Sequence, residues 1–516
     1  MTNWTAGYVA DIDYSHGYYQ ELSPEVLSLA MLNKGIATRN GRPFRYLELG
    51  FGQGLSLAIH AAACEGEFWG IDFNPGQAAN AKELAESFGA GEHIYDQSFE
   101  EFAARDDLPE FDVITLHGIW SWVSDESRAV IIDLARRKLA FGGVLYISYN
   151  CFPGSAPMAP LRHLLSLHAE LSGPGDYGLT GRIDKSLEFA EQIVDCGAHY
   201  FLLNPAVTSK LQALKGLTRK YLAHEYFNRH WELMAFSDVC EMLADAKLTF
   251  AASATLLDHV DTVNLTPARQ ALLAEITHPI LRESVRDYIV NAQFRRDIFV
   301  KGGREMNAVQ RNEAYLAQRF VLVSLPEQIP SKMEGLGDEL IFDQNIYQPL
   351  IAAMAEQEHA PKTLRELAGI SALKHRPLAH LIEALLVLYG GGHVLPAQNA
   401  ESVESAKPRC RLLNAHIINR ARFSEDIVCL ASPVTGGGFR VVRMEQLFLF
   451  ARQADVTDPS VWAHFVWQSL SAAGRKITKD GVVLEAAEEN IAELLAQANE
   501  FAAKRLPILQ ALQVVE

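Results

Sequence analysis

The feature that most constrains the fold is the run from Arg45 to Ser56, which reads Arg-Tyr-Leu-Glu-Leu-Gly-Phe-Gly-Gln-Gly-Leu-Ser. Its first half is typical of a buried strand, and its second half is a glycine turn leading into a helix that starts near Leu55. Glycines at alternate positions let the backbone turn tightly and approach a ligand. The N-terminus of the next helix points toward that ligand. The run therefore predicts a ligand site at the end of a strand.

The acidic residues around this turn indicate the kind of ligand. A second predicted strand, 67–71, ends at Asp72. A carboxylate about 20 residues after a glycine turn can accept hydrogen bonds from a ribose. The spacing Gly-x-Gly-x-Gly differs from the NAD fingerprint Gly-x-Gly-x-x-Gly. Glu48, two residues before the first glycine, would repel a pyrophosphate but favour an ammonium and a sulfonium. The pattern favours S-adenosylmethionine (SAM), the alternative being a glycine-rich turn without a ligand.

Composition sets broad limits. A chain of 516 residues, 49% hydrophobic and 21% charged, is typical of a globular protein with about two to four domains. Its net charge of -17 argues against broad nucleic-acid binding and allows a basic partner. We find no apolar run of membrane-spanning length and no signal-peptide pattern. The cysteines form no Cys-x-x-Cys pair, so we expect reduced thiols in a cytoplasmic protein and no metal site; they are Cys64, Cys151, Cys196, Cys240, Cys410 and Cys429.

Strand and helix patterns alternate over the first 150 residues, which predicts a parallel sheet with helices on both faces. This is an α/β fold with a Rossmann-like core. The predicted strands are 45–49, 67–71, 92–95, 111–116 and 143–149. The predicted helices are 55–64, 75–88, 98–104 and 125–139.

The chain then enters a long helical stretch, and the sheet is expected to end late. We expect a helix over 236–246, a sixth strand at 248–254, helices within 265–292 and an antiparallel seventh strand at 295–301. We interpret this as one core with two helical insertions, the alternative being a separate helical domain from residue 157. The expected domains are a SAM-binding core, a helical insertion, the completion of the core, a middle domain and a C-terminal domain, over 1–156, 157–228, 229–303, 304–400 and 401–516.

The middle domain resembles a winged helix. Helices are expected over 345–356, 364–368 and 377–389, followed by a short wing at 390–395. A basic face would suit DNA, but the acidic chain favours a packing or protein-contact module; that face comprises Lys362, Arg365, Lys374, His375 and Arg376. The C-terminal domain is expected to be mixed α/β, with a loop at 431–438 and an amphipathic helix at 486–505.

Four further runs carry a family resemblance. They are His-Gly-Ile-Trp-Ser-Trp-Val at 117–123, Ser-Tyr-Asn-Cys-Phe-Pro-Gly at 148–154, Tyr-Leu-Ala-His-Glu-Tyr-Phe-Asn at 221–228 and Phe-Arg-Arg-Asp-Ile-Phe at 294–299. The chain resembles the bacterial class I SAM-dependent methyltransferases that carry a methyltransferase regulatory domain, and is similar to the rickettsial protein lysine methyltransferases that act on outer-membrane proteins. The resemblance implies a regulatory segment near 217–302, a helical dimerisation element, and middle and C-terminal domains around an open cleft. We assign dimerisation, or a lid, to 157–228.

Cofactor contacts are expected beyond the carboxyl ends of the strands. The glycine turn would hold the methionine part of SAM, an acid the ribose, an aromatic ring the adenine, and the loop after the third strand the adenine edge. The end of the fourth strand would add further contacts. The expected residues are Glu48, Gly50, Gly52, Gly54, Asp72, Phe73, Gln97, Ser98, Phe99, His117 and Gly118.

The acceptor site is expected next to the methyl group. His117, Tyr149 and Asn150 are the candidates to orient or deprotonate an amine, although each also has a purely structural explanation. Tyr14, Tyr18 and Tyr19 could form a lid or pack on the sheet, and Trp120 and Trp122 could line the acceptor slot or belong to the core; of these, the expected substrate contacts are Tyr14, Tyr19, Trp120 and Trp122. His224 and Glu225 read as a pH-sensitive pair or, more simply, a structural one.

These observations predict methyl transfer to lysine side chains of a protein, in an enzyme that forms a homodimer. Two alternatives stay open at this point. One is an O- or N-methyltransferase of a glycan or small molecule. The other is a non-catalytic regulator that binds SAM.

Overall fold

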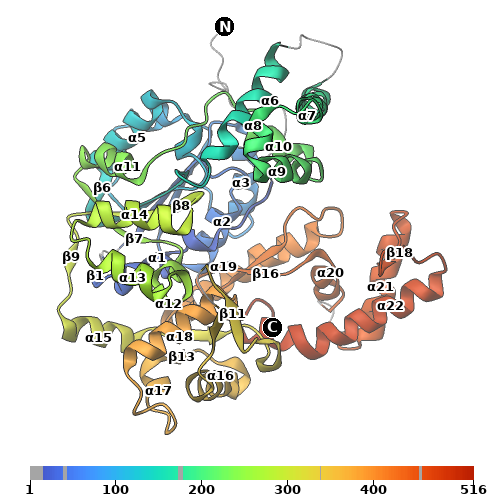
Figure 1. The fold of residues 1–516 in the computed structure, drawn as a ribbon. Coiled ribbons are helices and arrows are strands. Elements are labelled where there is room, and N and C mark those ends of the chain that lie inside the picture. The colour runs from blue at the N-terminus through green and yellow to red at the C-terminus, as the bar shows by residue number, and fades with distance from the viewer. Residues whose placement is uncertain (1–14, 39–42, 172–177, 337–338, 453–455) are drawn as a thin grey trace.

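The computed structural model describes residues 15–38, 43–171, 178–336, 339–452 and 456–516. Its centre is a seven-stranded sheet with strand order β4-β3-β2-β5-β6-β8-β7 (Figure 1). The first five strands in this order pair in parallel, and β8 runs antiparallel to both of its neighbours. The expected parallel sheet, completed by an antiparallel seventh strand, is confirmed. The strands are β2 (Arg45–Leu49), β3 (Glu67–Ile71), β4 (Ile94–Tyr95), β5 (Phe111–Leu116), β6 (Leu139–Asn150), β7 (Leu248–Ser253) and β8 (Phe294–Lys301).

Helices follow the strands as the alternating pattern predicts. Proline at the first helical position starts several of them, because its fixed φ suits a helix and its missing N–H is not needed there. The helices of this part of the chain, apart from the insertion described below, are α1 (Pro24–Asn33), α2 (Leu55–Ala63), α3 (Pro75–Glu86), α4 (Phe99–Ala103), α5 (Asp125–Lys138), α11 (Phe236–Ala244), α12 (Asp261–Asn264), α13 (Pro267–Ala274) and α14 (Pro279–Val290).

Both faces of the sheet are buried, and side chains alternate between them. On β6, Val144 and Tyr146 belong to a hydrophobic cluster that includes α1. Leu145 and Ile147 belong to a different cluster, with α5 and α11. This alternation follows from the two-residue period of a strand. Burial on both faces explains why these strands read as continuous apolar runs.

The helical stretch after β6 is an insertion, because β7 and β8 return to the same sheet. The alternative of a separate helical domain from residue 157 onward is therefore wrong. Residues between Leu161 and Ala223 form a hydrophobic cluster of their own. The inserted helices are α6 (Ala159–Leu171), α7 (Leu179–Asp195), α8 (His199–Leu203), α9 (Pro205–Lys215) and α10 (Arg219–Tyr226).

The middle region contains the expected helices but no wing hairpin after them. The segment 390–395 ends a helix and enters β14, which pairs with a strand that precedes all three helices. The observed region therefore differs from the expected winged helix. β14 pairs with β10, which comes before the helices, and not with a second wing strand after them. The elements are α15 (Ala308–Ala317), β10 (Arg319–Leu322), α16 (Gln344–His359), β13 (Lys362–Thr363), α17 (Leu364–Ala368), α18 (Leu378–Gly390) and β14 (Val394–Ala397), with a hairpin of β11 (Lys332–Glu334) and β12 (Glu339–Ile341).

The C-terminal region is mainly helical. The prediction of a loop over 431–438 is wrong at both ends of this segment. Its first and last residues belong to β15 and β16, which pair as a largely buried hairpin. The glycines that suggested a loop instead give β16 a close approach to Tyr18, whose hydroxyl would lie 2.5 Å from a Cβ at Gly437. The elements are α19 (Ala400–Arg420), β15 (Cys429–Ser432), β16 (Gly437–Arg440), α20 (Arg443–Arg452), α21 (Pro459–Ala472), β17 (Thr478–Lys479), β18 (Val482–Val483), α22 (Ala487–Glu500) and α23 (Leu506–Ala511).

Short strands at the edge of the molecule connect its parts. β1 (Ile36–Ala37) pairs with β9 (Arg304–Glu305), which follows the last strand of the sheet.

Within the described ranges, no helix has both the length and the apolar character needed to cross a bilayer.

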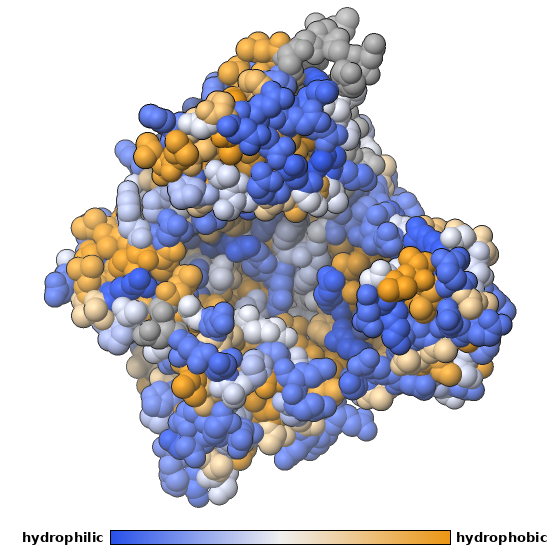
Figure 2. Space-filling model, turned by 45° about the vertical axis from the view of Figure 1, so that its right-hand side comes forward, coloured by the Kyte–Doolittle hydropathy of each residue, from blue (hydrophilic) through white to orange (hydrophobic). Residues whose placement is uncertain are grey.

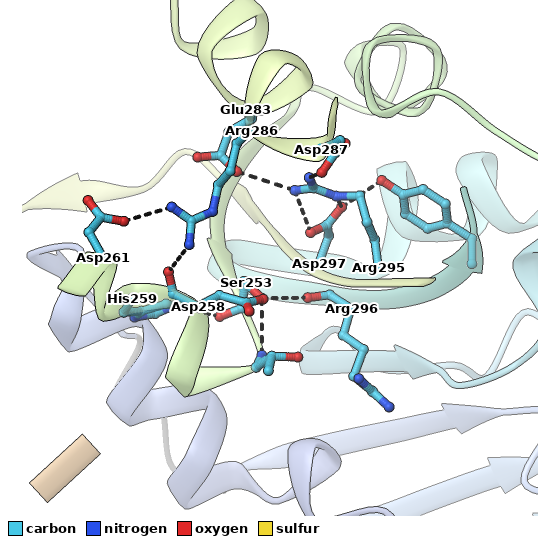
Figure 3. A network of polar contacts seen from close by, with 12 residues as sticks. Ser253, Asp258, His259, Asp261, Glu283, Arg286, Asp287, Arg295, Arg296 and Asp297 are labelled. Carbon is cyan, nitrogen blue, oxygen red and sulfur yellow. Dashed lines mark hydrogen bonds and ion pairs between the residues drawn. The ribbon is translucent and has the colours of Figure 1, made fainter. Parts of the chain in front are cut away.

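A buried polar network fixes β8 against α14 (Figure 3). The guanidinium of Arg295 donates to Asp287 at 2.5 Å and to Asp297 at 2.8 and 3.0 Å. The hydroxyl of Tyr149 on β6 donates to Asp297 at 2.6 Å. All four side chains are buried. The network therefore joins β6, β8 and α14. Its buried charged groups are paired with one another only when these three elements pack in this way.

This network predicts a large loss of stability for Arg295→Met. Two buried carboxylates would lose their cation, which destabilises a fold by about 3–5 kcal/mol. Guanidinium unfolding followed by tryptophan fluorescence should show a lower midpoint. Arg136→Met is the matched control, because Arg136 pairs with Asp133 at the surface and such pairs contribute at most about 1 kcal/mol. Equal midpoints for both variants would contradict the assignment.

Candidate functional site

A cavity of about 1360 Å³, measured to its open mouth, lies at the carboxyl ends of β2, β3 and β5. This is where open α/β sheets bind their ligands. Figure 2 shows a face of the molecule that is deeply hollowed at its centre, with mostly hydrophilic surface in the hollow. The cavity walls come from the sheet edge and from the inserted helices.

The glycine turn after β2 forms the floor of the cavity. Gly50, Gly52 and Gly54 all have positive φ, at 73°, 58° and 75°, a region that favours glycine. A Cβ at Gly50 would lie 2.5 Å from Ile119. Gly50 and Gly52 line the cavity. The expected cofactor contact of Gly54 does not lie at its surface; this residue precedes α2, and its Cβ would lie 2.3 Å from Ala81 of α3.

Two acids stand beside this turn. Glu48 is buried at the end of β2, and its Oε2 has no hydrogen-bond partner among the described residues. Burial, with the nearby Asp72 charge, raises the pKa of Glu48 to about 8. Asp72 accepts hydrogen bonds from the backbone N–H groups of Gly52 and Asn74, both at 2.9 Å. Burial raises the pKa of Asp72 to about 6, although both hydrogen bonds oppose this shift.

The expected adenine end is also assembled. Phe73, Gln97, Ser98 and Phe99 all line the cavity. The Ser98 hydroxyl accepts from the N–H of Glu101 at 3.2 Å and so caps α4. The cap fixes the loop that carries these side chains, because it satisfies a free N–H at the helix start.

His117 lies in the cavity wall within an aromatic stack. Its ring stacks on Tyr19 with centroids 3.8 Å apart, and its Nδ1 lies 2.8 Å from the hydroxyl of Tyr146. Burial and the charge of Arg296 lower the pKa of His117 to about 3. The imidazole is therefore neutral at pH 7. Gly118 next to it also lines the cavity, and its N–H donates to Ser148 at 2.7 Å.

Several predicted acceptor contacts lie elsewhere. Tyr149 is buried and its hydroxyl is bound to Asp297, so its expected catalytic role is not supported. Asn150 and Trp120 are absent from the cavity lining, and Trp120 is fully buried in the core. Trp122 does line the cavity. Tyr14 lies outside the described residues.

The N-terminal tyrosines separate into two roles. Tyr19 lines the cavity. Tyr18 is partly buried and packs against the C-terminal region instead, with its ring 5.6 Å from that of His60 and against Gly438. It therefore packs between parts of the protein and is not a lid residue.

Three residues of the inserted region also line the cavity and were not predicted as site residues. They are His224, Glu225 and His230. The sequence marked His224 and Glu225 only as an adjacent polar pair. Their place could not be read from the sequence, because it depends on how α10 folds back toward the sheet.

The charges of the cavity wall fit a cationic ligand. Its lining includes Glu48, Asp72, Glu100 and Glu225, and no lysine or arginine among the described residues. An anionic pyrophosphate would find no counter-charge there. The orphaned oxygen of Glu48 and the glycine cradle fit SAM, which carries an ammonium and a sulfonium. Within the described ranges, no group of three His, Cys, Asp or Glu side chains is placed to hold a metal.

Glu48→Gln is expected to stabilise the protein and weaken cofactor binding. The pKa of Glu48 is about 8 in the folded state and about 4.3 in the unfolded state. Between these pH values the folded protein holds a proton that the unfolded chain has lost, so the free energy of unfolding falls as the pH rises. Glutamine removes this fall, raising the unfolding free energy at pH 8 by about 1–3 kcal/mol. Loss of the charge should weaken binding of S-adenosylhomocysteine, the demethylated product of SAM, by about 10-fold or more.

Guanidinium unfolding at pH 6 and pH 8 and calorimetry with S-adenosylhomocysteine measure the two effects. Glu67→Gln, on the adjacent strand, is the control, because Glu67 is half-exposed and paired with Arg45. It should change neither quantity by more than about 1 kcal/mol. Undiminished S-adenosylhomocysteine binding by Glu48→Gln would contradict the role of Glu48.

Comparisons with known proteins agree with this geometry. A family model described as "Methyltransferase domain" matches residues 47–143, and one described as "Predicted methyltransferase regulatory domain" matches residues 218–301. Uncharacterized protein sll1526 of Synechocystis sp. is 38% identical over 99% of both chains. Uncharacterized protein RP789 of Rickettsia prowazekii is 23% identical over 62% of this chain and 57% of its own length.

Among solved structures, PKMT2 from Rickettsia typhi in complex with AdoHcy (S-adenosylhomocysteine) has a similar fold. The TM-score is 0.67 at 16% identity, covering 95% of this chain and 98% of that chain. The similarity extends beyond the sheet to the inserted, middle and C-terminal regions. Together with the matched domains and the close full-length relative, these findings show that the chain belongs to the class I SAM-dependent methyltransferases with a methyltransferase regulatory domain.

Proposed function

We propose that the protein transfers the methyl group of SAM to lysine side chains of a protein substrate. The observation that carries this proposal is the charge of the cavity wall, which has four carboxylates and no lysine or arginine among its described residues. Such a wall attracts a second cation beside SAM and repels anionic acceptors. The likeness in fold to PKMT2, a protein lysine methyltransferase, supports the same acceptor class.

The reaction divides between cofactor and protein. SAM supplies an electrophilic methyl group. Gly50 and Gly52 would bring the backbone close to its methionine part, and Asp72 would accept hydrogen bonds from the ribose. Glu48, protonated in the free site at pH 7, would supply negative charge once the bound cation lowers its pKa. The stack of Tyr19 on His117 offers an aromatic wall, which favours a cation. The protein mainly aligns the reactants in a site with little water.

A lysine acceptor must lose a proton before it reacts. Since a lysine side chain in water has a pKa of about 10.4, this loss costs about 4–5 kcal/mol at neutral pH. The apolar rings of Trp122, Phe73 and Phe99 line the same cavity, and desolvation lowers the pKa of an amine. The aromatic wall therefore favours the neutral, reactive amine, and the proton leaves to water at the open mouth of the cavity before the methyl group is transferred.

The alternatives have less support. An oxygen acceptor on a glycan or small molecule needs a stronger base, and His117 was the expected one. A pKa of about 3 makes it a poor base. A non-catalytic SAM-binding regulator would need the acids beside the cofactor but not a further acid such as Glu225 in the same cavity.

The cellular setting is also part of the proposal. All six cysteines are free, which fits the reducing cytoplasm. Nucleic-acid binding stays disfavoured; on the basic face of the middle region, Arg365 is paired with Glu313 at 2.7 Å.

Lysine transfer can be tested with methyl-labelled SAM and a protein extract from a strain lacking this gene. Label should appear as methyl-lysine after acid hydrolysis. An extract with acetylated lysines is the matched control and should accept little label, because its amines are blocked. Label that survives acetylation, or that appears in glycans, would refute the lysine assignment. Mass spectrometry of proteins from strains with and without the gene then identifies the acceptor.

A homodimer formed through the inserted helices is the last part of the proposal. Leu202 and Leu203 on α8 are 65% and 79% exposed, and exposed apolar side chains mark contact surfaces. Leu203→Glu should therefore shift the protein from dimer to monomer in size-exclusion chromatography with light scattering. Phe423→Glu, at a 77% exposed position in the C-terminal region, should leave the dimer intact. A monomeric wild-type protein would exclude this surface as a dimer contact.

A further inference from the structure

The inserted helix α10 supplies a second acidic wall to the cavity. Glu225 lies in its last turn, and it lines the same cavity as Glu48 and Asp72. The sheet edge carries the latter two acids beside the glycine turn. Glu225 comes instead from the segment matched by the regulatory-domain model. The regulatory segment therefore contributes an acid of its own to the cavity.

The carboxylate of Glu225 has no hydrogen bond or ion pair within the described part of the chain. The cation whose charge acts on Glu225 is Arg162 of α6, which is bound to other groups. Its Nε donates to the backbone oxygen of Glu225 at 3.3 Å, and its Nη2 donates to the backbone oxygen of Asn228 at 2.8 Å. Its guanidinium also lies over the ring of Trp231 at 4.8 Å and that of Trp122 at 5.4 Å.

The other acids of the cavity are already engaged or belong to the cofactor end. Asp72 accepts two backbone hydrogen bonds. Glu100 accepts from the Ser127 hydroxyl at 3.1 Å. Glu48 lies directly before the glycine turn. Glu225 is thus the acid left for a second positive charge.

We propose that Glu225 binds the ammonium group of the acceptor, so that α10 selects cationic acceptors and holds the lysine side chain in the cavity. Trp122 lines the same cavity and offers an apolar surface to the methylene chain. Burial supports the proposal, since it raises the pKa of Glu225 to about 7 although Arg162 opposes the shift. A partly buried acid of this kind gains more from a cation than an exposed one does.

This inference rests on the proposed function, but it can fail separately. The first experiment measures binding and needs no turnover. The protein is loaded with S-adenosylhomocysteine, and N-acetyl-lysine methylamide is titrated by saturation-transfer NMR. The neutral N-acetyl-norleucine methylamide is the matched ligand. Wild-type protein should bind the lysine amide at least about 10-fold more tightly than the norleucine amide, and Glu225→Gln should remove this preference.

Two variants separate charge from structure. Glu225→Asp keeps the charge and should retain part of the preference for the lysine amide. Glu188→Gln removes a charge from α7, where Glu188 is exposed and paired with Lys185, and should bind both amides as wild type does. The affinity for S-adenosylhomocysteine, measured by calorimetry, should stay within about twofold of the wild-type value for these two variants and for Glu225→Gln.

The second experiment measures methyl transfer to a lysine-rich protein extract. Glu225→Gln should raise KM about 10-fold or more with a smaller change in kcat. If wild-type protein prefers the lysine amide but methylates no lysine, the proposed function fails and the ammonium site stands. If wild type methylates lysines while Glu225→Gln keeps wild-type KM and amide preference, the ammonium site is wrong. Absence of any lysine preference in wild-type binding also overturns it.

Discussion

The structure depends on the burial of two carboxylates, Glu48 and Asp72, at the ends of adjacent parallel strands. Burying an acid is unfavourable unless it finds a partner. Asp72 has two backbone N–H groups as partners, while one oxygen of Glu48 finds no partner in the part of the chain that the structure describes. The site is therefore incomplete as a protein surface and complete only with a cation. This places the preference for a positively charged methyl donor in the fold itself, before any side chain of the acceptor site is considered.

The regulatory segment has two physical tasks in this fold. Residues 218–301 include β7 and β8, which complete the sheet, and α10, which forms a wall of the cavity. The Arg295 network joins β8 to α14 and, through Tyr149, to β6. A change in the packing of β8 therefore acts on β6, which pairs with β5, the strand whose end lies beside the site. Regulation, where it occurs, need not involve a separate ligand domain.

The sequence predicted the sheet well because its signals are local. An apolar run followed by glycines with positive φ specifies a strand, a turn and a helix within about ten residues. The antiparallel seventh strand could be placed for the same reason, although the inserted helices separate it from the fifth. Acceptor contacts were less predictable. Tyr149 and Trp120 are close in sequence to residues that line the cavity, but the two-residue period of β6 turns the Tyr149 side chain toward Asp297. Glu225 reaches the cavity only through the tertiary packing of α10.

The C-terminal region is connected to the site through α2. The N-terminus of α2 follows the glycine turn, while its last carbonyl groups would be left without partners at the other end. Gln398 donates to the backbone oxygen of Ala63 at 2.8 Å, and Arg409 donates to that of Cys64 at 2.8 Å. A cation at a helix C-terminus complements the helix dipole. Gln398, just before α19, and Arg409, on α19, thus satisfy the helix whose opposite end faces the cofactor. These hydrogen bonds therefore couple the packing of the C-terminal region to the helix that begins at the glycine turn.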